Sequence, residues 1–240
     1  MSYISHKLKK TCIPNKGYGY IANEDIKCGE TLIKEIPFTI PTDNIYSDIF
    51  QLLYEVFKDT AIITQFMKLH PKTIELIHNI DQNNIIKELS KVKNHNAEIY
   101  NFFTDNYTTN DIILFCAKYM CNAFCFKGKP AFLFNGTIMN HSCLPNTIFG
   151  EVGGKIIFKA GMDIKKGNEI YDNYIDITQC KLKRKEHLLS QYGFICNCER
   201  CIETKDNIIK KHNANALDIE NKRFDTFGFT KSKNISNDRY

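Results

Sequence analysis

Three cysteines near the end of the chain have the spacing of metal ligands. Cys196, Cys198 and Cys201 form the pattern C-x-C-x-x-C, which lets three thiolates converge on one ion. Zinc in a structural site takes four ligands in a tetrahedron, so one more ligand must come from another part of the chain. The residues alone leave four candidates for that ligand, which are Cys143, Cys180, His141 and His187.

The number of cysteines and the start of the chain bear on the setting in which the protein works. The chain has ten cysteines and begins with the polar stretch MSYISHK, and the sequence shows neither a signal peptide nor a membrane-spanning run. We therefore expect an intracellular protein, in the nucleus or the cytoplasm, with reduced thiols and no membrane partner. The frequent use of Asn, Ile and Lys is typical of an AT-rich genome, such as that of a protist or of a large virus acting in a host cell.

A dense polar segment precedes the cysteine cluster. The heptad NHSCLPN at 140–146 follows a short apolar run and has the composition of a turn. Loop capping by Asn140 and Asn146 would explain these residues one by one. It does not explain why they occur together with a distant cysteine cluster, and this combination favours a functional interpretation of both motifs.

Short strands and a long helical stretch must position these motifs. Residues 16–22 and 31–36 combine glycines with short apolar runs, and they predict two strands joined by a turn. From residue 45 the apolar residues recur at steps of three and four, which predicts a mostly helical segment over 45–126.

The second half of the chain returns to strands and ends in a polar tail. The pair Gly153-Gly154 lies between two apolar runs and predicts a tight hairpin. Residues 25–29 and 163–167 have similar sequences, which predicts two similar turns and not a repeat. The polar stretch 204–240 predicts a short helix or disorder. Periodicity therefore indicates mixed α and β structure.

Composition and charge exclude few classes of protein. With 43% hydrophobic and 25% charged residues, the chain has the composition of a globular protein. Its net charge of +5 is too small to indicate a dedicated nucleic-acid surface, so no direct nucleic-acid partner is expected. The basic run at 181–185 is interpreted as the solvated face of a helix.

The order and spacing of three motifs resemble the SET domain of protein-lysine methyltransferases. They are NHSCLPN at 140–146, EIYDNYID at 169–176 and QYGFICNCERC at 191–201, the last of which is similar to the cysteine-rich post-SET segment of that family. The stretch CNAF at 121–124 is similar to a helix of the SET-and-MYND (SMYD) subgroup. The resemblance implies an α+β fold with small, mostly antiparallel sheets around a knot-like core, a helical insert and a zinc-binding post-SET segment.

The resemblance also divides the chain into segments. Residues 1–44 are expected to form the N-terminal part of the SET domain, 45–126 a helical insert, 127–190 the SET core, 191–203 the post-SET zinc segment and 204–240 a polar C-terminal tail. Three departures from the SMYD subgroup are expected. The zinc-rich MYND module is missing, because residues 37–110 contain no cysteine. No long helical domain follows residue 201, and Gly193 stands where a bulkier residue is common, which implies a wider substrate channel.

The functional residues of the family can be carried over to the positions that match. S-adenosylmethionine is the methyl donor that the resemblance implies, and the positions implied to bind it are Lys16, Gly17, Tyr18, Asn122, Asn140, His141, Tyr174 and Phe194. Tyr174 is also implied to be the catalytic residue beside the transferred methyl group, and Tyr192 to be a wall of the substrate channel. The implied ligands of a structural zinc are Cys143, Cys196, Cys198 and Cys201.

The reaction explains why a tyrosine suits this position. A sulfonium loses its charge as the methyl group moves in line to a neutral amine, so the site needs orientation and fixed dipoles more than a strong base. The hydroxyl of Tyr174 supplies such a dipole. The target lysine must first lose its proton, and an apolar channel walled by Tyr192 and Phe194 would lower the pKa of that lysine by disfavouring the ammonium.

These motifs predict an enzyme that transfers a methyl group from S-adenosylmethionine to the Nε atom of a lysine in a protein, with a histone tail as the expected substrate class. The protein is expected to act as a monomer. One alternative is a catalytically weak SET-like module that binds a peptide or partner in the same channel. Another is a zinc-stabilised nucleic-acid binder, whose affinity for DNA would fall steeply with salt.

Overall fold

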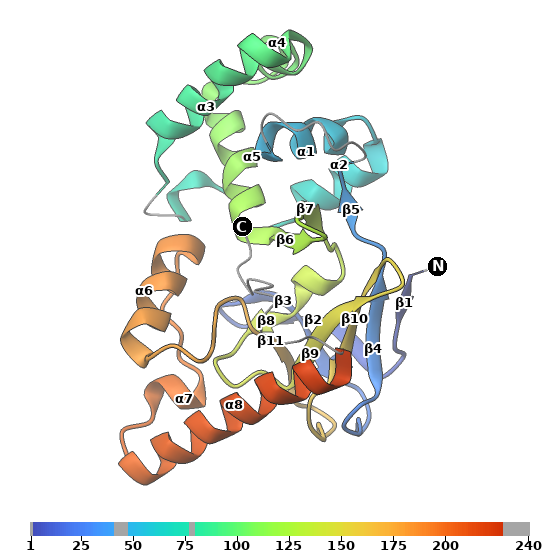
Figure 1. Cartoon of the computed structure of the whole chain (residues 1–240), viewed down its shortest axis with the longest axis vertical. Coiled ribbons are helices and arrows are strands. Elements are labelled where there is room, and N and C mark those ends of the chain that lie inside the picture. Colours follow the sequence, from blue (N-terminus) through green and yellow to red (C-terminus); the bar gives the residue numbers. More distant parts are fainter. Residues whose placement is uncertain (1, 41–47, 77–79, 228–240) are drawn as a thin grey trace. The chain divides into compact units, whose positions relative to one another are not determined.

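Small β-sheets and α-helices share the chain, which confirms the predicted α+β class (Figure 1). A computed structural model describes residues 2–40, 48–76 and 80–227. The chain divides into two compact units. The first contains Met1–Pro37, Asn135–Leu188 and the segment that begins at Ile195, and the second contains Phe38–Phe134 and Leu189–Phe194.

Two four-stranded sheets make up most of the first unit. Their strands are β1 (Tyr3–Ile4), β2 (Leu8–Ile13), β3 (Gly17–Ala22), β4 (Thr31–Glu35), β8 (Asn140–His141), β9 (Thr147–Val152), β10 (Lys155–Ala160) and β11 (Glu169–Asp172). One sheet has the strand order β1-β4-β10-β9 and the other the order β2-β3-β11-β8. Neighbouring strands are antiparallel except for β11 and β8, which run parallel.

The two N-terminal strands predicted at 16–22 and 31–36 are present as β3 and β4, but they lie in different sheets. β3 pairs with β2 and β11, whereas β4 pairs with β1 and β10. The strands themselves are local features of the sequence. Their partners lie up to about 150 residues away, and no local pattern specifies such pairing.

Gly153 and Gly154 form the hairpin turn between β9 and β10 that the sequence predicts. Their φ angles are +58° and +75°, which are the left-handed values that a two-residue turn of this kind requires. Val152 and Lys155 close the turn as the first register pair of the ladder. The predicted hairpin is therefore confirmed.

The two similar turns at 25–29 and 163–167 bind each other. Ile26 and Ile164 exchange backbone hydrogen bonds of 2.8 Å in both directions. The aspartate of each turn then accepts a backbone N–H of the other turn at 2.9 Å. The sequence similarity therefore marks a reciprocal pairing of two turns, a role that the separate prediction of each turn did not include.

Helices dominate the second unit. They are α1 (Asp48–Phe57), α2 (Thr60–Met67), the short 3-10 helix η1 (Ile74–Leu76), α3 (Gln82–His95), α4 (Ala97–Asn106) and α5 (Thr109–Asn122). A three-stranded sheet of order β5-β7-β6 accompanies them, built from β5 (Phe38–Thr39), β6 (Ala123–Phe126) and β7 (Lys129–Phe132). The stretch predicted to be helical at 45–126 thus ends in strand β6, and residues 45–47 lie outside the described residues.

Aromatic side chains fill the core of the second unit. The ring of Phe57 lies 4.9 Å from that of Phe115 and 6.1 Å from that of Phe103, between ring centres. These are contact distances for tilted and edge-on aromatic pairs. Helix α5 begins after Thr108, whose side chain and that of Asp111 cap each other's backbone N–H groups.

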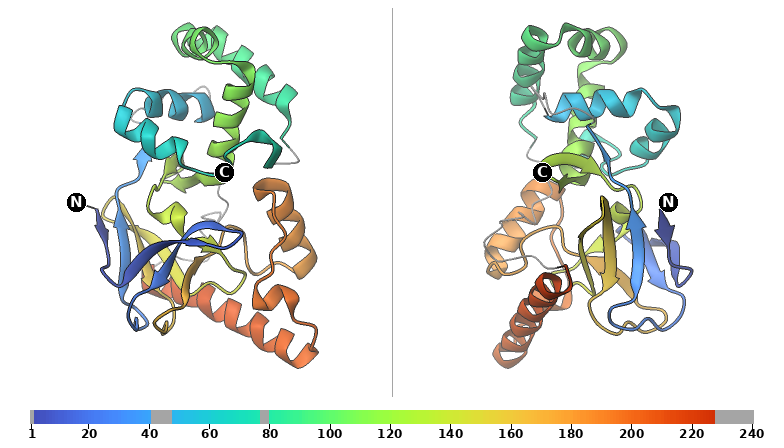
Figure 2. Two further views of the ribbon diagram at one scale, coloured as in Figure 1. Left: turned by 180° about the vertical axis from the view of Figure 1, so that it is seen from behind. Right: turned by 45° about the vertical axis from the view of Figure 1, so that its right-hand side comes forward.

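The stretch after residue 204, predicted to be a short helix or disordered, forms a long helix. After α6 (Lys181–Tyr192) and α7 (Glu199–Ile202), helix α8 extends over Asp206–Phe227 and lies along β9 (Figure 2). Arg223 of α8 is 4% exposed, donates to the backbone oxygen of Phe149 at 2.9 Å and pairs with Glu220 at 3.3 Å. The apolar period of α8 is hidden in the sequence because a charged pair occupies part of its buried face. Residues 228–240 lie outside the described residues.

The packing of α8 on β9 requires a glycine at position 150. A Cβ atom at Gly150 would lie 2.4 Å from the ring of Phe227. We expect Gly150→Ala to lower the free energy of unfolding by about 1–3 kcal/mol, because overpacking forces the ring and helix to move. In a Phe227→Ala background the same change should cost much less, which a double-mutant cycle in urea measures.

Gly161→Ala is the matched control, because a Cβ atom there would meet its nearest neighbour at an ordinary 3.4 Å. An equal loss of stability from Gly150→Ala in both backgrounds would show that α8 does not pack on β9 in this way.

Candidate functional site

The four cysteines predicted as zinc ligands lie together in the first unit. The sulfur atoms of Cys143, Cys196, Cys198 and Cys201 are all within 4.8 Å of one another. Cys143 Sγ is 4.0 Å from Cys196 Sγ and 3.5 Å from Cys201 Sγ. A tetrahedron with zinc–sulfur bonds of about 2.3 Å has sulfur–sulfur edges of about 3.8 Å, so the arrangement fits a zinc ion.

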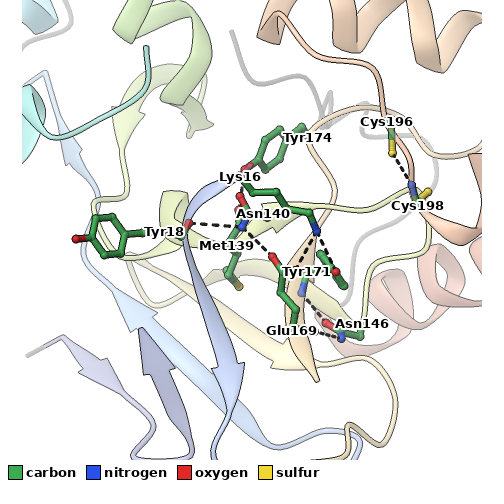
Figure 3. A network of polar contacts seen from close by, with 10 residues as sticks. All are labelled: Lys16, Tyr18, Met139, Asn140, Asn146, Glu169, Tyr171, Tyr174, Cys196 and Cys198. Carbon is green, nitrogen blue, oxygen red and sulfur yellow. Dashed lines mark hydrogen bonds and ion pairs between the residues drawn. The ribbon is translucent and has the colours of Figure 1, made fainter. Parts of the chain in front are cut away.

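Local backbone structure holds these sulfurs in place. Cys198 precedes the first turn of α7, so Cys201 donates its backbone N–H to Cys198 O at 2.8 Å. The backbone N–H of Cys198 in turn points at Cys196 Sγ at 3.5 Å (Figure 3). Hydrogen bonding with Cys143 lowers the pKa of the Cys201 thiol. The cluster therefore favours the thiolate at Cys201, the form that binds metal.

The sequence predicted that the basic run at 181–185 is a solvated helix face, and this holds for only part of the run. It forms the first turns of α6, and its lysines at 181 and 183 are exposed. Arg184 is 2% exposed and donates from Nη2 to Cys201 Sγ at 3.9 Å. In the sequence this arginine is hidden within a run of like charges. Its burial is possible because a cation next to four potential thiolates can be stable where an isolated buried cation is not.

His141 links the predicted catalytic tyrosine to the cysteine cluster. The backbone N–H of Tyr174 donates to His141 Nδ1 at 3.0 Å, and His141 Nε2 lies 3.3 Å from Cys143 Sγ. The Tyr174 hydroxyl donates to the backbone oxygen of Met139 at 2.8 Å (Figure 3). Both ends of Tyr174 are therefore fixed, the backbone by His141 and the hydroxyl by Met139.

A second polar network surrounds the carboxylate of Glu169, at the start of β11 (Figure 3). Lys16 Nζ lies 2.9 Å from Glu169 Oε2, and Asn140 Nδ2 donates to Glu169 Oε1 at 2.8 Å. Lys16 Nζ also donates to the Tyr171 hydroxyl at 3.2 Å. Burial lowers the pKa of Lys16, but the hydrogen bonds to Glu169 and Tyr171 outweigh it and raise the pKa overall. The predicted cofactor residues Lys16 and Asn140 thus meet at Glu169, for which no role was predicted.

The turn between β2 and β3 approaches Asn140 closely. Gly17 has a φ of +78° with no atom within 4 Å of where a Cβ would be, so its backbone borders open space. A Cβ atom at Gly19 would lie 2.7 Å from Asn140 Nδ2, so a larger residue there would displace the Asn140 side chain. Tyr18, between them, is 64% exposed. The start of β3 therefore leaves the backbone at Gly17 uncovered.

The other predicted site residues, Asn122, Tyr192 and Phe194, belong to the second unit. Asn122 donates from Nδ2 to the backbone oxygens of His70 at 2.5 Å and Lys118 at 2.8 Å. The rings of Tyr192 and Phe194 are 6.5 Å apart between centres. Their segment is attached to the end of α5, because Gln191 donates to Met120 O at 3.2 Å and the Cys121 thiol donates to Gln191 O at 3.4 Å.

Lys118 is a buried cation on α5 that sequence reasoning did not identify. It is 1% exposed, and its ammonium donates to the backbone oxygens of Leu69 at 2.7 Å and Pro71 at 2.6 Å. Together with Asn122, it fastens the segment 69–71 to α5. Desolvation by burial lowers the pKa of Lys118 to about 8.

Comparison with known proteins identifies the family. The SET domain family matches residues 17–175 of the chain. The SET domain-containing protein L678 of Acanthamoeba polyphaga mimivirus is 41% identical over 200 residues, which cover 82% of this chain and 78% of the relative. Human N-lysine methyltransferase SMYD2 is 27% identical over 169 residues, which are 63% of this chain and 39% of SMYD2. The chain thus spans about two fifths of the length of that relative.

Solved structures show the same fold. The SET domain of LSMT bound to methyllysine and AdoHcy superposes with a TM-score of 0.63 over 83% of this chain and 55% of that chain, at 13% identity. Rubisco LSMT bound to AdoMet gives a TM-score of 0.59 over 85% of this chain and 57% of that chain, at 14% identity. None of the helices in the described ranges has both the length and the apolar composition that a membrane crossing requires.

The buried ammonium of Lys118 makes stability depend on pH. Its pKa is about 8 in the folded chain and near its usual 10.5 when unfolded. Between these values the unfolded chain binds more protons, so stability rises with pH across that window, by on the order of 3 kcal/mol. Lys118→Met should unfold at lower urea at pH 7.5, and its deficit relative to wild type should grow at pH 9.5.

The exposed Lys87 of α3 gives the matched control, because Lys87→Met removes a cation without uncovering buried carbonyl groups. A deficit of Lys118→Met that stays constant or shrinks between the two pH values would contradict a lowered pKa at this lysine.

Proposed function

The chain belongs to the SET-domain family, and on this premise we propose that it transfers a methyl group from S-adenosylmethionine to the Nε atom of a lysine in a protein substrate. The observation that carries the proposal is the double fixation of Tyr174, by His141 at its backbone and by Met139 O at its hydroxyl. The names of two relatives support it: SMYD2 is an N-lysine methyltransferase, and LSMT has been solved with lysine and AdoHcy.

The turn at 16–19 and the strand end at Asn140 suit the donor. S-adenosylmethionine, when bound, supplies an electrophilic methyl group on a positively charged sulfur. The backbone at Gly17 borders open space that the donor could occupy, and the close approach of Gly19 places Asn140 next to this strand. We assign Lys16 a backbone role only, because its ammonium is already paired with Glu169. Further contacts to the donor are assigned to Tyr18, Asn122, His141, Tyr174 and Phe194.

Tyr174 acts as an oriented dipole. Its hydroxyl proton is donated to Met139 O, so its oxygen keeps its lone pairs for the reacting groups. A fixed oxygen needs no reorganisation as charge leaves the donor, and it helps to align the methyl group with the incoming amine. No strong base is required at this position.

Aromatic walls prepare the substrate. Tyr192 is 4% exposed and its ring lies next to that of Phe194, so an amine between aromatic walls of this kind would lose much of its hydration. Desolvation lowers the pKa of the substrate lysine and favours the neutral amine that can attack. We propose a lysine-containing protein segment as substrate, with histone tails as the first class to test.

A structural zinc ion completes the site in our proposal. Cys143, Cys196, Cys198 and Cys201 would hold it, and no ligand position would be left for catalysis. Zinc would attach the segment after residue 195 to the turn that carries His141, and His141 contacts Tyr174. Metal binding would then stabilise the position of the catalytic tyrosine.

Replacement of the tyrosine hydroxyl tests the catalytic role. We expect Tyr174→Phe to lower kcat for transfer of a tritiated methyl group to histones by about 100-fold, as loss of one oriented polar group at a reacting centre does. The dissociation constant for S-adenosylhomocysteine should change little. Tyr3→Phe, at an exposed tyrosine of β1, is the control.

Transfer by Tyr174→Phe at the wild-type rate would remove Tyr174 from the mechanism. If the wild-type protein transfers no methyl group to histones or to lysate proteins, the alternative of a SET-like binding module replaces the enzyme.

Replacement of Glu169 tests the cofactor turn. Glu169→Gln keeps an acceptor for Asn140 but loses the charge that holds Lys16. The partly exposed pair is worth about 1 kcal/mol, so we expect S-adenosylhomocysteine to bind about 5-fold more weakly in calorimetry. Glu30→Gln breaks a similar 2.8 Å pair with Lys7 and should leave the affinity unchanged. Equal affinities of Glu169→Gln and wild type would separate this network from cofactor binding.

A further inference from the structure

Two arginine side chains lie buried beside the cysteine cluster. Arg184 of α6 is 2% exposed and Arg200 of α7 is 5% exposed. Burial of a guanidinium is unfavourable unless an anion or a full set of hydrogen-bond acceptors compensates it. The groups that compensate these two positive charges therefore indicate the charge of the cysteine cluster.

Arg184 makes contact with one of the cluster sulfurs. Its Nη2 atom donates to Cys201 Sγ at 3.9 Å, and its Nη1 atom donates to the backbone oxygen of Gln179 at 2.6 Å. Its Nε atom is buried with no hydrogen-bond partner. If the Cys201 sulfur were neutral, Arg184 would have two neutral acceptors and one unpaired N–H group, which is a poor environment for a buried cation. A Cys201 thiolate would supply the missing negative charge.

Arg200 connects the backbone of another ligand to two further segments. Its Nη1 atom donates to the backbone oxygens of Cys143 at 3.1 Å and Ile177 at 2.6 Å. Its Nε atom donates to Asn213 Oδ1 on α8 at 3.0 Å. All three acceptors are neutral, so Arg200 also lacks a counter-charge among its direct partners.

No carboxylate among the described residues supplies that charge. Within the part of the chain that the structure describes, neither Arg184 nor Arg200 forms an ion pair with an aspartate or glutamate. One Zn²⁺ ion with four thiolates has a net charge of about −2. The two guanidinium groups carry +2 together, so a zinc-loaded cluster and the two arginines are neutral as a set.

We propose that Arg184 and Arg200 are the counter-charges of the zinc tetrathiolate, with Arg184 as a direct hydrogen-bond donor to the Cys201 thiolate. This inference rests on the zinc site of the proposed function. The positive charges make it harder to protonate the bound thiolates, and the N–H···S bond fixes the direction of the Cys201 sulfur. The arginines therefore tighten zinc binding without touching the ion.

Zinc affinity tests this role without reference to enzyme activity. The full chain is loaded with zinc, and the dissociation constant is measured by competition with a chromophoric chelator at pH 7. We expect Arg184→Met and Arg200→Met each to weaken zinc binding by about 10–100-fold, the effect known for groups that support metal ligands. Arg184→Lys keeps the positive charge but loses the planar guanidinium with its several N–H donors. Its zinc affinity should fall between those of Arg184→Met and wild type.

A neighbour on the same helix provides the control. Lys183→Met also removes one positive charge from α6, but Lys183 is exposed and should not affect zinc. Cys143→Ser removes one zinc ligand, so its loss of zinc affinity shows how much a disrupted site loses. If Arg184→Met does not fold, as judged by circular dichroism, Arg184→Gln removes the charge while keeping an N–H donor, and it should likewise bind zinc more weakly than wild type.

The outcomes separate the two proposals. If wild type binds zinc and both arginine variants match it within about two-fold, the counter-charge role is wrong and the zinc site stands. If wild type and Cys143→Ser both fail to retain zinc, the zinc site itself is wrong, and the role of the arginines with it. Weakening by both arginine variants but not by Lys183→Met supports the inference.

Discussion

The convergence of four sulfurs is the constraint on which the rest of the site depends. Cys143 and Cys201 are 58 positions apart in the chain, yet their sulfurs lie 3.5 Å from each other. This contact fixes the turn that carries His141 against the segment that follows residue 195. Because His141 then accepts the backbone N–H of Tyr174, the position of the tyrosine follows from the geometry of the cluster. Such indirect fixation removes the conformational freedom of the tyrosine before any ligand binds.

Glu169 holds the turn between β2 and β3 in place, as the cysteines hold the segment that contacts Tyr174. Its carboxylate receives Lys16 from the β2–β3 turn and Asn140 from β8, and its backbone oxygen accepts from Asn146 Nδ2 at 2.8 Å. Three segments therefore depend on one residue. The close approach of Gly19 to Asn140 is possible only because no side chain intervenes. Glu169 and Asn140 thus shape this backbone surface and restrict its motion. The entropic cost of ordering the surface when a ligand binds is therefore small.

Local features of this molecule were predictable from sequence, whereas relations between distant segments were not. The Gly153-Gly154 hairpin and strands β3 and β4 follow from patterns within a few residues. The meeting of Cys143 with the C-terminal cysteines was implied only by family resemblance, because spacing alone left four candidates open. The pairing of β4 with β10 and the mutual binding of the turns at 25–29 and 163–167 depend on contacts across more than 100 residues. Helix α8 is longer than predicted for another reason, since Glu220 and Arg223 on its buried face are residue types typical of exposed surfaces.

Buried charged side chains account for several features that the sequence did not predict. In each case the charged side chain is stabilised by hydrogen bonds to backbone groups. Glu35 accepts the backbone N–H groups of Asn135 and Gly136 at 2.9–3.1 Å, at the start of the second half of the first unit. Lys118 donates to carbonyl groups of the segment before η1. In each case a charged side chain satisfies backbone groups of a segment that has no regular partner there, and burial strengthens the bond because little water competes. Irregular backbone in each unit is thus held by charges that composition alone assigns to the surface.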